Sequence, residues 1–592
     1  MMRPSAPRSP GATSGGVDVV AKSPVRTVKH LLTRPIRLPR LTPYVPAPDD
    51  PTIFWFNSER DDIIREVTRR CVERHVHEQR PLEYVLNEVA HEEVKRLESQ
   101  RDDEARDSLG FWRGTMRRVG RMSESEKKET LRLICERMAW DIAGNFDPRI
   151  YQFATRAVPP LLTGVMKPSA LPEDLMTMAS GTHVVDEMLR TEGDIDRLKR
   201  LAKRGTLVFV PTHSSNLDSI ALGYALMREG LPPVVYGAGK NLFTNPIISF
   251  FMHNLGAYRV DRRIRAALYK DVLKTYSCVM IERGYHSLFF PGGTRSRSGM
   301  LERKLKLGLA GTAIEAFSRN RVRGIARPVF FVPTTINYGL VLEAETLVED
   351  WLKEAGKARY IIEDDEFSQL DRWLAFFRRV AQMESACVIR FGRPLDPFGN
   401  AVDDDGGSLT PDGRVIDPGT YVQFRGVPTI EPRRDAEYTR EMGQVLVGEF
   451  ERDTVLMSTQ IVAHALFRRL VRATPGVDLF GRLRHRGEVT VRRDDLAREV
   501  GQMRERLRDL ASRGEVHLSE LADRGDATTL IDRVFAAWNG YHRRTIVIEH
   551  DGQITAEDPT MLLYYQNRLV PYAERVAGEG DLAAAREIAR LG

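Results

Sequence analysis

The chain has 592 residues, of which 42% are hydrophobic and 29% charged, and its formal net charge is +6. This length allows about three to five structural units of ordinary size. The four cysteines lie far apart and form no C-x-x-C pair. Composition therefore argues against a disulfide scaffold or a zinc ribbon and is compatible with a reducing cytosol.

The positive charge is concentrated in two stretches. Residues 1–50 hold eight Lys or Arg against three Asp, a net charge of +5, and residues 253–306 hold twelve bases against four acids, a net charge of +8. The remainder of the chain is therefore acidic. We expect residues 1–50 to form a disordered basic N-terminal arm, which either contacts an anionic membrane surface or is merely solvated.

No apolar stretch reaches the roughly 20 residues that a transmembrane helix needs, so none is predicted. The longest uncharged segment, residues 241–258, carries three Asn, a Pro and a His. It is too polar to span a bilayer, and an interfacial position is the most we expect of it. The N-terminus lacks an apolar signal core, so secretion is not expected.

Residues 51–204 predict an N-terminal helical domain. Ser123 and Glu126 have the spacing of a capping box. Behind them, Leu131, Ile134 and further apolar residues repeat at helical spacing and predict one buried stripe.

Three histidines of this region are candidate metal ligands, namely the pair His75 and His77, and His91 beside Glu92. A metal site needs several convergent ligands, which this pattern does not provide. Solvated histidines on helix faces are therefore the favoured interpretation, and we predict no metal site.

Short apolar runs begin near residue 205 and alternate with periodic helical stretches. This alternation predicts an α/β core over residues 205–400, with a mixed sheet and flanking helices. The runs that we expect to form strands are residues 206–210, 234–236, 287–290, 328–332 and 387–391.

Residues 401–430 predict a polar loop or hairpin, and residues 431–592 a mainly helical C-terminal domain. The expected elements of that domain are helices over residues 435–451, 455–473, 493–513 and 527–539, and a short strand over residues 545–549. The fold class is thus an α/β core between N-terminal and C-terminal helical domains.

The first segment with chemical content is VPTHSSNLD, residues 210–218, directly after a predicted strand. Five residues of ideal helix leave two side chains about 140° apart, so His213 and Asp218 cannot meet within one helix. They can meet if His213 lies in the turn and Asp218 in the first turn of the next helix. The carboxylate would then fix the imidazole tautomer and leave the other nitrogen as a general base. The alternative is a polar loop histidine near a helix-start acid.

Three further segments carry arginines, glycines or a strand end. GAYRVDRRIR (256–265) holds four arginines in seven residues, whose planar groups suit phosphate oxygens. In FFPGGTRSRSG (289–299), a strand ends in paired glycines that let backbone N–H groups approach an anion, and Arg295 and Arg297 supply charge. FVPTTINY (331–338) is a strand running into a proline. Taken alone, the first segment also suits a solvated helix start, the second a plain turn and the third a strand end.

In this order, the four segments resemble the glycerophospholipid acyltransferase superfamily. That family shows the blocks H-x-x-x-x-D, G-x-x-x-I/V-x-R, F-P-E-G-T-R-S and V-P-V/I/T, and all four fall here between His213 and Tyr338. The helical N-terminal region and residues 434–442, 458–467 and 562–570 are similar to the large bacterial-type glycerol-3-phosphate acyltransferases. They are also similar to the related dihydroxyacetone-phosphate acyltransferases.

The resemblance implies an α/β acyltransferase core that transfers a fatty acyl group to the 1-hydroxyl of sn-glycerol 3-phosphate, giving lysophosphatidate. The donor would be a thioester, acyl-CoA or acyl carrier protein, with no further cofactor. His213 would remove the hydroxyl proton, Asp218 would orient His213, and the alkoxide would attack the thioester directly, without a covalent acyl-enzyme. The residues that would hold glycerol 3-phosphate are Arg262, Gly293, Arg295, Ser296, Arg297 and Pro333.

The same resemblance implies a peripheral protein at the cytoplasmic face of the (inner) cell membrane. We expect no nucleic-acid partner, because the bases are concentrated around a phosphate-type site and lack interleaved aromatic residues.

Two positions depart from the family pattern. Gly292 stands where the third block has Glu, a carboxylate that belongs to the acceptor site in the family, and Val570-Pro571 stands where a histidine is expected. Glu282 lies nearby in sequence, but nothing in the sequence identifies it as a substitute. The departures keep three alternatives open: dihydroxyacetone phosphate or a lysophospholipid as acceptor, or a catalytically impaired homologue that binds a membrane surface.

Overall fold

A computed structural model describes residues 44–78, 80–98, 103–156, 188–239, 246–355 and 386–590. The predicted basic arm, except residues 44–50, lies outside the described residues, as does part of the uncharged segment 241–258. Among the described residues, no helix is both long enough and apolar enough to cross a membrane.

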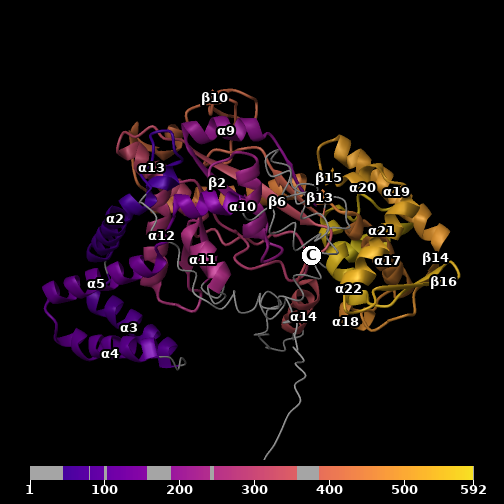
Figure 1. Cartoon of the computed structure of the whole chain (residues 1–592), viewed down its shortest axis with the longest axis horizontal. Helices are drawn as coiled ribbons and strands as arrows, with labels where there is room; N and C mark the ends of the chain where they lie inside the picture. Colours follow the sequence, from indigo (N-terminus) through magenta and orange to yellow (C-terminus); the bar gives the residue numbers. More distant parts are fainter. Residues whose placement is uncertain are drawn as a thin grey trace, which may run out of the picture.

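A seven-stranded mixed sheet forms the centre of the molecule (Figure 1). Its strands, in spatial order, are β1 (Leu189–Glu192), β7 (Cys387–Phe391), β6 (Val329–Tyr338), β2 (Thr206–Pro211), β5 (Ser287–Leu288), β3 (Val235–Gly239) and β4 (Ala257–Val260). Neighbouring strands are parallel except β6 and β7, where Ile336 pairs with Ile389 in antiparallel register. The predicted mixed sheet is confirmed.

The five predicted strands coincide with the five interior strands of the sheet, whereas both edge strands, β1 and β4, escaped prediction. Interior strands are covered on both faces and form continuous apolar runs. The sequence of β1, LRTE, is short and polar, as edge strands commonly are, and carries no such signal. Because β1 joins the sheet, the α/β core begins before residue 205.

Alternating side chains of β2 point to two separate cores, which places helices on both faces of the sheet. Leu207 and Phe209 belong to one core, with α9 (Ile195–Arg204) and α10 (Asp218–Arg228). Val208 and Val210 belong to the other. The helices of that second face are α12 (Ala267–Glu282), α13 (Ala310–Val322) and α16 (Pro432–Asp453).

The N-terminal helices, drawn in indigo in Figure 1, pack against the outer side of α12. They are α2 (Phe56–His77), α3 (Leu82–Glu98), α4 (Asp103–Arg118) and α5 (Glu124–Ile142), preceded by a short 3-10 turn, η1 (Thr52–Trp55). The predicted capping box begins α5: the Glu126 N–H donates to Ser123 Oγ, and the Ser123 N–H donates to the Glu126 carboxylate. The predicted apolar stripe behind it is buried.

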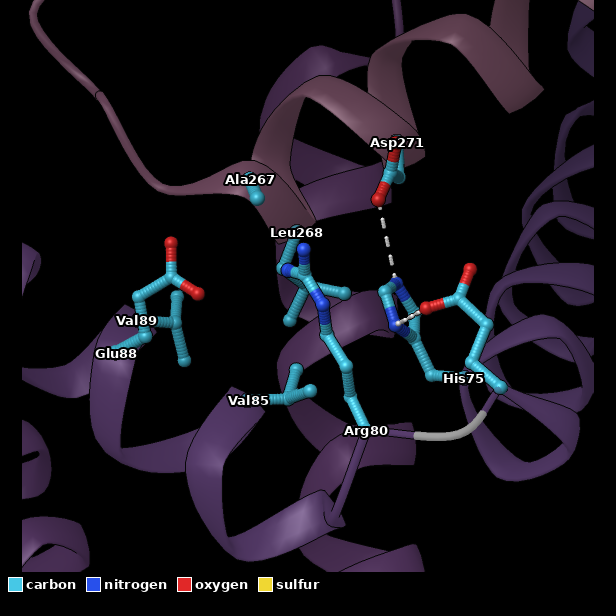
Figure 2. Close-up of a pocket in the computed structure, with 9 residues that line it drawn as sticks. His75, Arg80, Val85, Glu88, Val89, Ala267, Leu268 and Asp271 are labelled. Atoms are coloured by element: carbon cyan, nitrogen blue, oxygen red, sulfur yellow. Dashed lines mark ion pairs between the residues drawn. The ribbon is translucent and has the colours of Figure 1, made fainter.

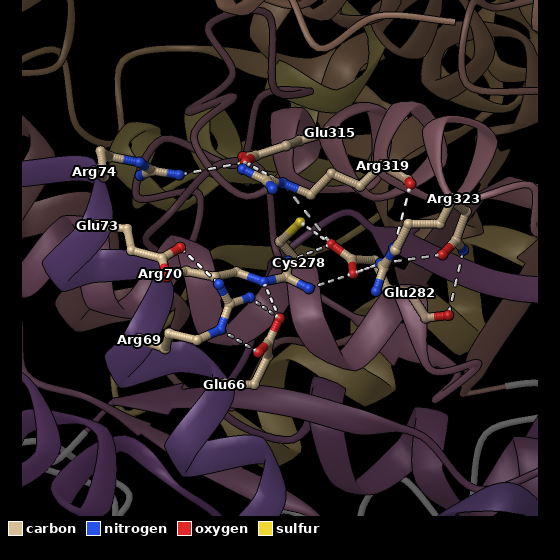
Figure 3. A network of polar contacts seen from close by, with 11 residues as sticks. Glu66, Arg69, Arg70, Glu73, Arg74, Cys278, Glu282, Glu315, Arg319 and Arg323 are labelled. Atoms are coloured by element: carbon tan, nitrogen blue, oxygen red, sulfur yellow. Dashed lines mark hydrogen bonds and ion pairs between the residues drawn. The ribbon is translucent and has the colours of Figure 1, made fainter. Parts of the chain in front are cut away.

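A buried ion network joins α2 to the core (Figure 3). Arg70 donates two hydrogen bonds to the carboxylate of Glu282, from Nη1 at 2.6 Å and from Nη2 at 2.8 Å. Arg323 pairs with the same carboxylate, and the Cys278 thiol donates to it at 3.1 Å. Glu282 therefore connects two structural units and lies outside the segments with chemical content.

The predicted polar loop at residues 401–430 forms short hairpins. Their strands are β8 (Ala401–Val402), β9 (Ser408–Leu409), β10 (Val415–Ile416), β11 (Gln423–Phe424) and β12 (Val427–Pro428).

The C-terminal part, drawn in yellow in Figure 1, surrounds the almost completely buried helix α17 (Ser458–Ala473). Its other helices are α18 (Leu479–Arg482), α19 (Arg493–Ser512), α20 (Glu520–Arg524), α21 (Ala527–Tyr541), α22 (Pro559–Gln566) and α23 (Leu582–Ala589), with the 3-10 turns η7 (Asn567–Tyr572) and η8 (Glu579–Asp581). Five short strands accompany them: β13 (Val455–Leu456), β14 (Thr490–Arg492), β15 (His517–Leu518), β16 (Val547–His550) and β17 (Gln553–Ala556). Strand β16 overlaps the one that we predicted at residues 545–549.

Candidate active site

His213 and Asp218 meet at the end of β2, in the arrangement that their spacing allowed. The strand ends at Pro211, His213 lies in the turn that follows, and Asp218 is the first residue of α10. His213 Nδ1 lies 2.7 Å from Asp218 Oδ2. A turn was required because two positions five residues apart on one helix face different directions.

The Asp218 carboxylate is surrounded by hydrogen-bond donors, which favour its ionised form. Its side chain is fully buried, and Oδ2 also accepts the backbone N–H groups of Ser214, at 2.7 Å, and Ser215, at 3.0 Å. It lies at a helix N-terminus, where the helix dipole favours negative charge. An ionised carboxylate at this distance accepts a hydrogen bond from the Nδ1–H group of His213, which leaves the lone pair of the ring on Nε2. That nitrogen is available as a general base.

The segment after β5 holds His213 from both sides. The imidazole stacks on Phe290, with ring centroids 4.2 Å apart and an interplanar angle of 27°. The backbone N–H of His213 donates to Glu302 Oε1 at 2.8 Å, and the backbone carbonyl of His213 accepts the N–H of Ser296 at 2.7 Å. The first and third sequence segments therefore form one site.

A cavity of about 320 Å³ opens beside this turn. Residues of the third segment line one side of it, and residues of α14 (Ala344–Ala355) and η7 line the other. The lining residues are Gly292, Thr294, Arg295, Ser296, Arg297, Ser298, Met300, Leu301, Glu302, Arg303, Lys304, Trp351, Glu354, Asn567, Val570 and Pro571.

The two predicted arginines of the third segment are each oriented by a glutamate. Arg295 Nη1 lies 3.2 Å from Oε1 of the buried Glu343, and Arg297 Nη2 lies 2.8 Å from Glu354 Oε2. Planar guanidinium groups that are fixed in this way can present their N–H donors to phosphate oxygens with little loss of conformational freedom.

Arg262 follows β4 and has an exposed side chain that is absent from the cavity lining. Desolvation of its guanidinium group and, secondarily, the positive charge of Arg295 lower the pKa of Arg262. The adjacent Arg263 is held by Asp261 at 2.9 Å. Arg262 and Arg295 therefore share one electrostatic environment, which a bound anion would stabilise.

The three remaining predicted residues shape the site or lie beside it. Gly293 has φ = +71°, a conformation that favours glycine, and a Cβ there would lie 2.5 Å from Lys306 Cδ. Ser296 Oγ donates to the Met300 carbonyl at 2.8 Å, which closes the turn. Pro333 lies inside β6 opposite Val210 and is not among the residues that line the cavity.

Sequence reasoning missed three charged residues of the site. Glu343 accepts the Ser215 hydroxyl at 2.8 Å and pairs with Arg295, and the buried Arg568 donates to Ser214 Oγ at 3.0 Å. Glu302 contacts His213 as described above. Only Arg568 carried a signal, because it lies in the family-like segment at residues 562–570.

The candidate histidine ligands of the N-terminal helices form no metal site, and the described residues hold no group of three or more His, Cys, Asp or Glu side chains that suits one. His77 and His91 are exposed, as expected, but the expectation is wrong for His75, which is buried beside a second cavity of about 510 Å³ (Figure 2). His75 Nε2 lies 3.4 Å from Asp271 of α12 and Nδ1 lies 3.3 Å from Glu78, so the ring contributes to helix packing.

Comparison with known proteins identifies an acyltransferase segment, since residues 193–337 match the family model Acyltransferase. The glycerol-3-phosphate acyltransferase of Haemophilus ducreyi is 34% identical over 202 residues, which cover 34% of this chain and 23% of the relative. The glycerol-3-phosphate acyltransferase of Pseudomonas paraeruginosa is 33% identical over 171 residues, or 29% of this chain and 20% of the relative. These matches confirm the resemblance to the glycerophospholipid acyltransferases, although they span less than a quarter of the relatives' length.

A solved structure is also similar: the 1-acyl-sn-glycerophosphate (LPA) acyltransferase PlsC from Thermotoga maritima. It is 16% identical, with a TM-score of 0.22, and the match covers 51% of this chain and 92% of that chain.

Proposed function

We propose that this chain is a glycerol-3-phosphate 1-O-acyltransferase, which transfers a fatty acyl group from acyl-CoA or acyl carrier protein to sn-glycerol 3-phosphate. The single observation that carries the proposal is the 2.7 Å contact between His213 and the buried Asp218, beside a cavity that holds Arg295 and Arg297. Such an arrangement combines a general base with a site for a phosphorylated acceptor. The names of the relatives support the choice of glycerol 3-phosphate.

In the proposed reaction, His213 Nε2 takes the proton of the 1-hydroxyl as its oxygen attacks the thioester carbonyl carbon. The C–S bond then breaks, and the leaving thiolate takes the proton from the imidazolium, which returns His213 to its starting state. Asp218 stabilises the imidazolium and holds the tautomer throughout. No residue forms a bond to the acyl group, so the acceptor and donor must be bound together.

The arginines hold the phosphate in this proposal. Arg295 and Arg297 lie in the cavity, and Arg262 adds charge from the loop after β4. Desolvation and, secondarily, the charge of Arg295 lower the pKa of Arg262, and an anion placed among the arginines would offset both effects. Gly293 and Ser296 maintain the conformation of the turn. Pro333 contributes only as part of strand β6, which pairs with β2 beside the site.

A product of this kind is a lipid, so we further propose that the chain works as a peripheral protein at the cytoplasmic face of the cell membrane. Sedimentation with anionic and with neutral vesicles tests this part. Binding that is equal for both vesicle types, or absent from both, would contradict it.

The test of the reaction is an acylation assay with radiolabelled glycerol 3-phosphate and each of the two donors. General-base catalysis typically contributes about 10²–10⁴-fold, so we expect His213→Ala to lose that factor in kcat. His77→Ala, at an exposed position on α2, is the matched control and should retain full activity.

Three outcomes would contradict the proposal. Unchanged activity of His213→Ala would eliminate the base. A wild type that is inactive with glycerol 3-phosphate but active with dihydroxyacetone phosphate or a lysophospholipid would make that compound the acceptor. Vesicle binding without any acyl transfer would identify the chain as a binding homologue.

A further inference from the structure

The space beside Gly292 is filled by another residue's carboxyl group. The backbone angle φ at Gly292 lies outside the left-handed region, so the backbone does not require a glycine there. A Cβ at Gly292 would lie 2.7 Å from Glu302 Oε1, 2.8 Å from its Cδ and 3.2 Å from its Oε2. The side chain of Glu302 thus occupies the place from which a side chain at residue 292 would extend.

The chain between these residues is folded so that Glu302 returns to the turn. Gly299 has φ = +77°, and a Cβ there would lie 2.2 Å from the Tyr564 carbonyl oxygen, so the loop lies directly against α22. The Ser298 carbonyl accepts the side-chain amide of Asn567 at 2.8 Å. With the loop fixed by the C-terminal helices, Glu302 Oε1 reaches the N–H of His213 at 2.8 Å.

The second oxygen of Glu302 has the properties of a ligand-binding atom. Oε2 is buried and has no hydrogen-bond partner among the described residues, although Glu302 lines the same cavity as Arg295 and Arg297. A buried polar atom without a partner is costly and needs an explanation such as a catalytic role or an absent ligand. Burial, only partly opposed by the His213 N–H and the charge of Arg568, raises the pKa of Glu302 to about 8.

The other glutamate of this stretch offers no such atom. Both oxygens of Glu282 accept hydrogen bonds from Arg70, and Arg323 pairs with it as well. Glu282 also lies at the boundary with α2, away from the cavity lining. Of the two acids, Glu302 alone is placed next to the proposed general base.

We propose that Glu302 is a substrate-binding residue of the acceptor site, where its Oε2 hydrogen-bonds a hydroxyl group of a phosphorylated polyol held by Arg295 and Arg297. Glycine at residue 292 leaves room for this carboxyl group, so the site obtains from residue 302 what a longer side chain at 292 would otherwise supply. A hydroxyl group suits either protonation state, because it both donates and accepts. The identity of the polyol rests on the proposed function, but the role of Glu302 does not depend on which polyol phosphate binds.

The experiment measures KM for the acceptor and for the acyl donor separately, in wild type and variants. A hydrogen bond to such a group is worth about 10- to 100-fold in affinity, so Glu302→Ala should raise KM for glycerol 3-phosphate by that factor and leave KM for the donor unchanged. Glu302→Gln keeps the contact with His213 and should show a smaller rise. The control Glu505→Gln, whose exposed carboxylate pairs with Arg508 on α19 and which is absent from the cavity lining, should match wild type.

A reciprocal pair of variants separates binding from folding. Gly292→Glu alone should lose activity, because two carboxyl groups would compete for one space. The double variant Gly292→Glu/Glu302→Ala should recover most of the loss in acceptor KM, since it returns one carboxyl group to that space. Thermal unfolding midpoints identify any variant that fails to fold, and a structural role alone would not move the acceptor KM selectively.

The inference is overturned if Glu302→Ala leaves the acceptor KM unchanged, raises both KM values equally, or is not improved by adding Gly292→Glu. This failure differs from failure of the proposed function. A wild type that acylates only dihydroxyacetone phosphate would refute the latter, and the same variants would then be tested through KM for that acceptor. A wild type that acylates none of the acceptors would overturn both proposals.

Discussion

The boundary between α2 and the core, and the turn after β5, each bury a glutamate but surround it differently. At the boundary, Glu282 receives two hydrogen bonds from Arg70 and pairs with Arg323. Burial alone would raise the pKa of Glu282, but the hydrogen bonds and charges of these arginines outweigh it and lower the pKa. The arginines compensate the negative charge of Glu282, and the network connects helix α2 to the α/β core.

In the turn after β5, the balance is reversed. Burial dominates at Glu302 and raises its pKa to about 8, because the His213 N–H and the charge of Arg568 compensate only in part. Glu282 is completely paired, whereas Glu302 is incompletely paired beside His213 and Asp218, and this difference supports our proposal that Glu302 contacts a ligand. Perturbed acids are concentrated at functional sites for this reason. Variants of the first region should therefore change stability, and variants of the second should change substrate handling.

The largest effect on stability is expected from Arg70→Ala. Removing one partner of a buried ion pair leaves the other charge uncompensated, which typically costs about 3–5 kcal/mol. We expect the free energy of unfolding, measured by urea titration, to fall by this amount, while kcat per folded molecule stays at the wild-type value.

Arg132→Ala is the matched control for this prediction. Arg132 also bridges two glutamates, Glu129 and Glu136, but on the outer surface of α5 with 43% of its side chain exposed. Exposed pairs contribute less than about 1 kcal/mol. Equal losses from the two substitutions would contradict the contrast between a matched interior network and solvent-exposed pairs.

The second prediction concerns the dependence of stability on pH. The folded state keeps a proton on Glu302 up to about pH 8, whereas the unfolded chain releases it near the ordinary glutamate value of 4.5. Because the folded state binds more protons in this window, the contribution of Glu302 to stability falls as the pH rises from 4.5 to 8. Glu302→Gln removes that slope.

We expect the stability difference between Glu302→Gln and wild type to shift by about 3 kcal/mol in favour of the variant between pH 5.5 and pH 8.5. Urea titrations at both pH values measure it, and subtraction cancels the histidines common to both proteins. Glu282 makes the opposite contribution, which is complete above pH 4.5 and lost at lower pH, so it adds no slope here. A constant difference would show that Glu302 is ionised in the folded state at neutral pH.

The sequence predicted those parts of the fold whose physical causes are local. Interior strands form apolar runs and the capping box has a fixed spacing, so β2, β6 and the start of α5 were found. The edge strands β1 and β4 were not, because a strand covered on fewer sides needs no apolar run. His75 shows the same limit: its burial depends on α12, which lies almost two hundred residues further along the chain.

The candidate site divides in the same way. His213 and Asp218 were found because they lie five residues apart across the junction between β2 and α10, and Arg295 and Arg297 because they follow paired glycines. Glu343 and Glu302 became visible only when the loops were folded against β2, and the sequence identified neither Glu282 nor Glu302 as a residue of the site. Tertiary contacts, such as that of Gly299 with α22, decide which acid lies beside the pair of His213 and Asp218.

The smallest expected effect compares two glycines with nearly the same backbone angle. Gly293 has φ = +71° and lies against Lys306, whereas Gly324 has φ = +73° and open space around the position that a Cβ would take, with no atom within 4 Å. An alanine at either position must adopt a left-handed conformation, which costs about 1–2 kcal/mol. Gly324→Ala should lose only that amount of stability, as measured by urea titration, and keep its activity.

Gly293→Ala should lose slightly more stability and, in addition, activity. Its Cβ would lie 2.5 Å from Lys306 Cδ, so the lysine side chain must move away from the turn that carries Arg295. The flexible lysine can move at little energetic cost, which is why the extra loss of stability is small. The displaced turn, however, no longer presents its arginines correctly, and we expect a several-fold rise in acceptor KM. If both variants lose the same stability and Gly293→Ala keeps its KM, the close packing at Gly293 supports the turn without setting the geometry of the acceptor site.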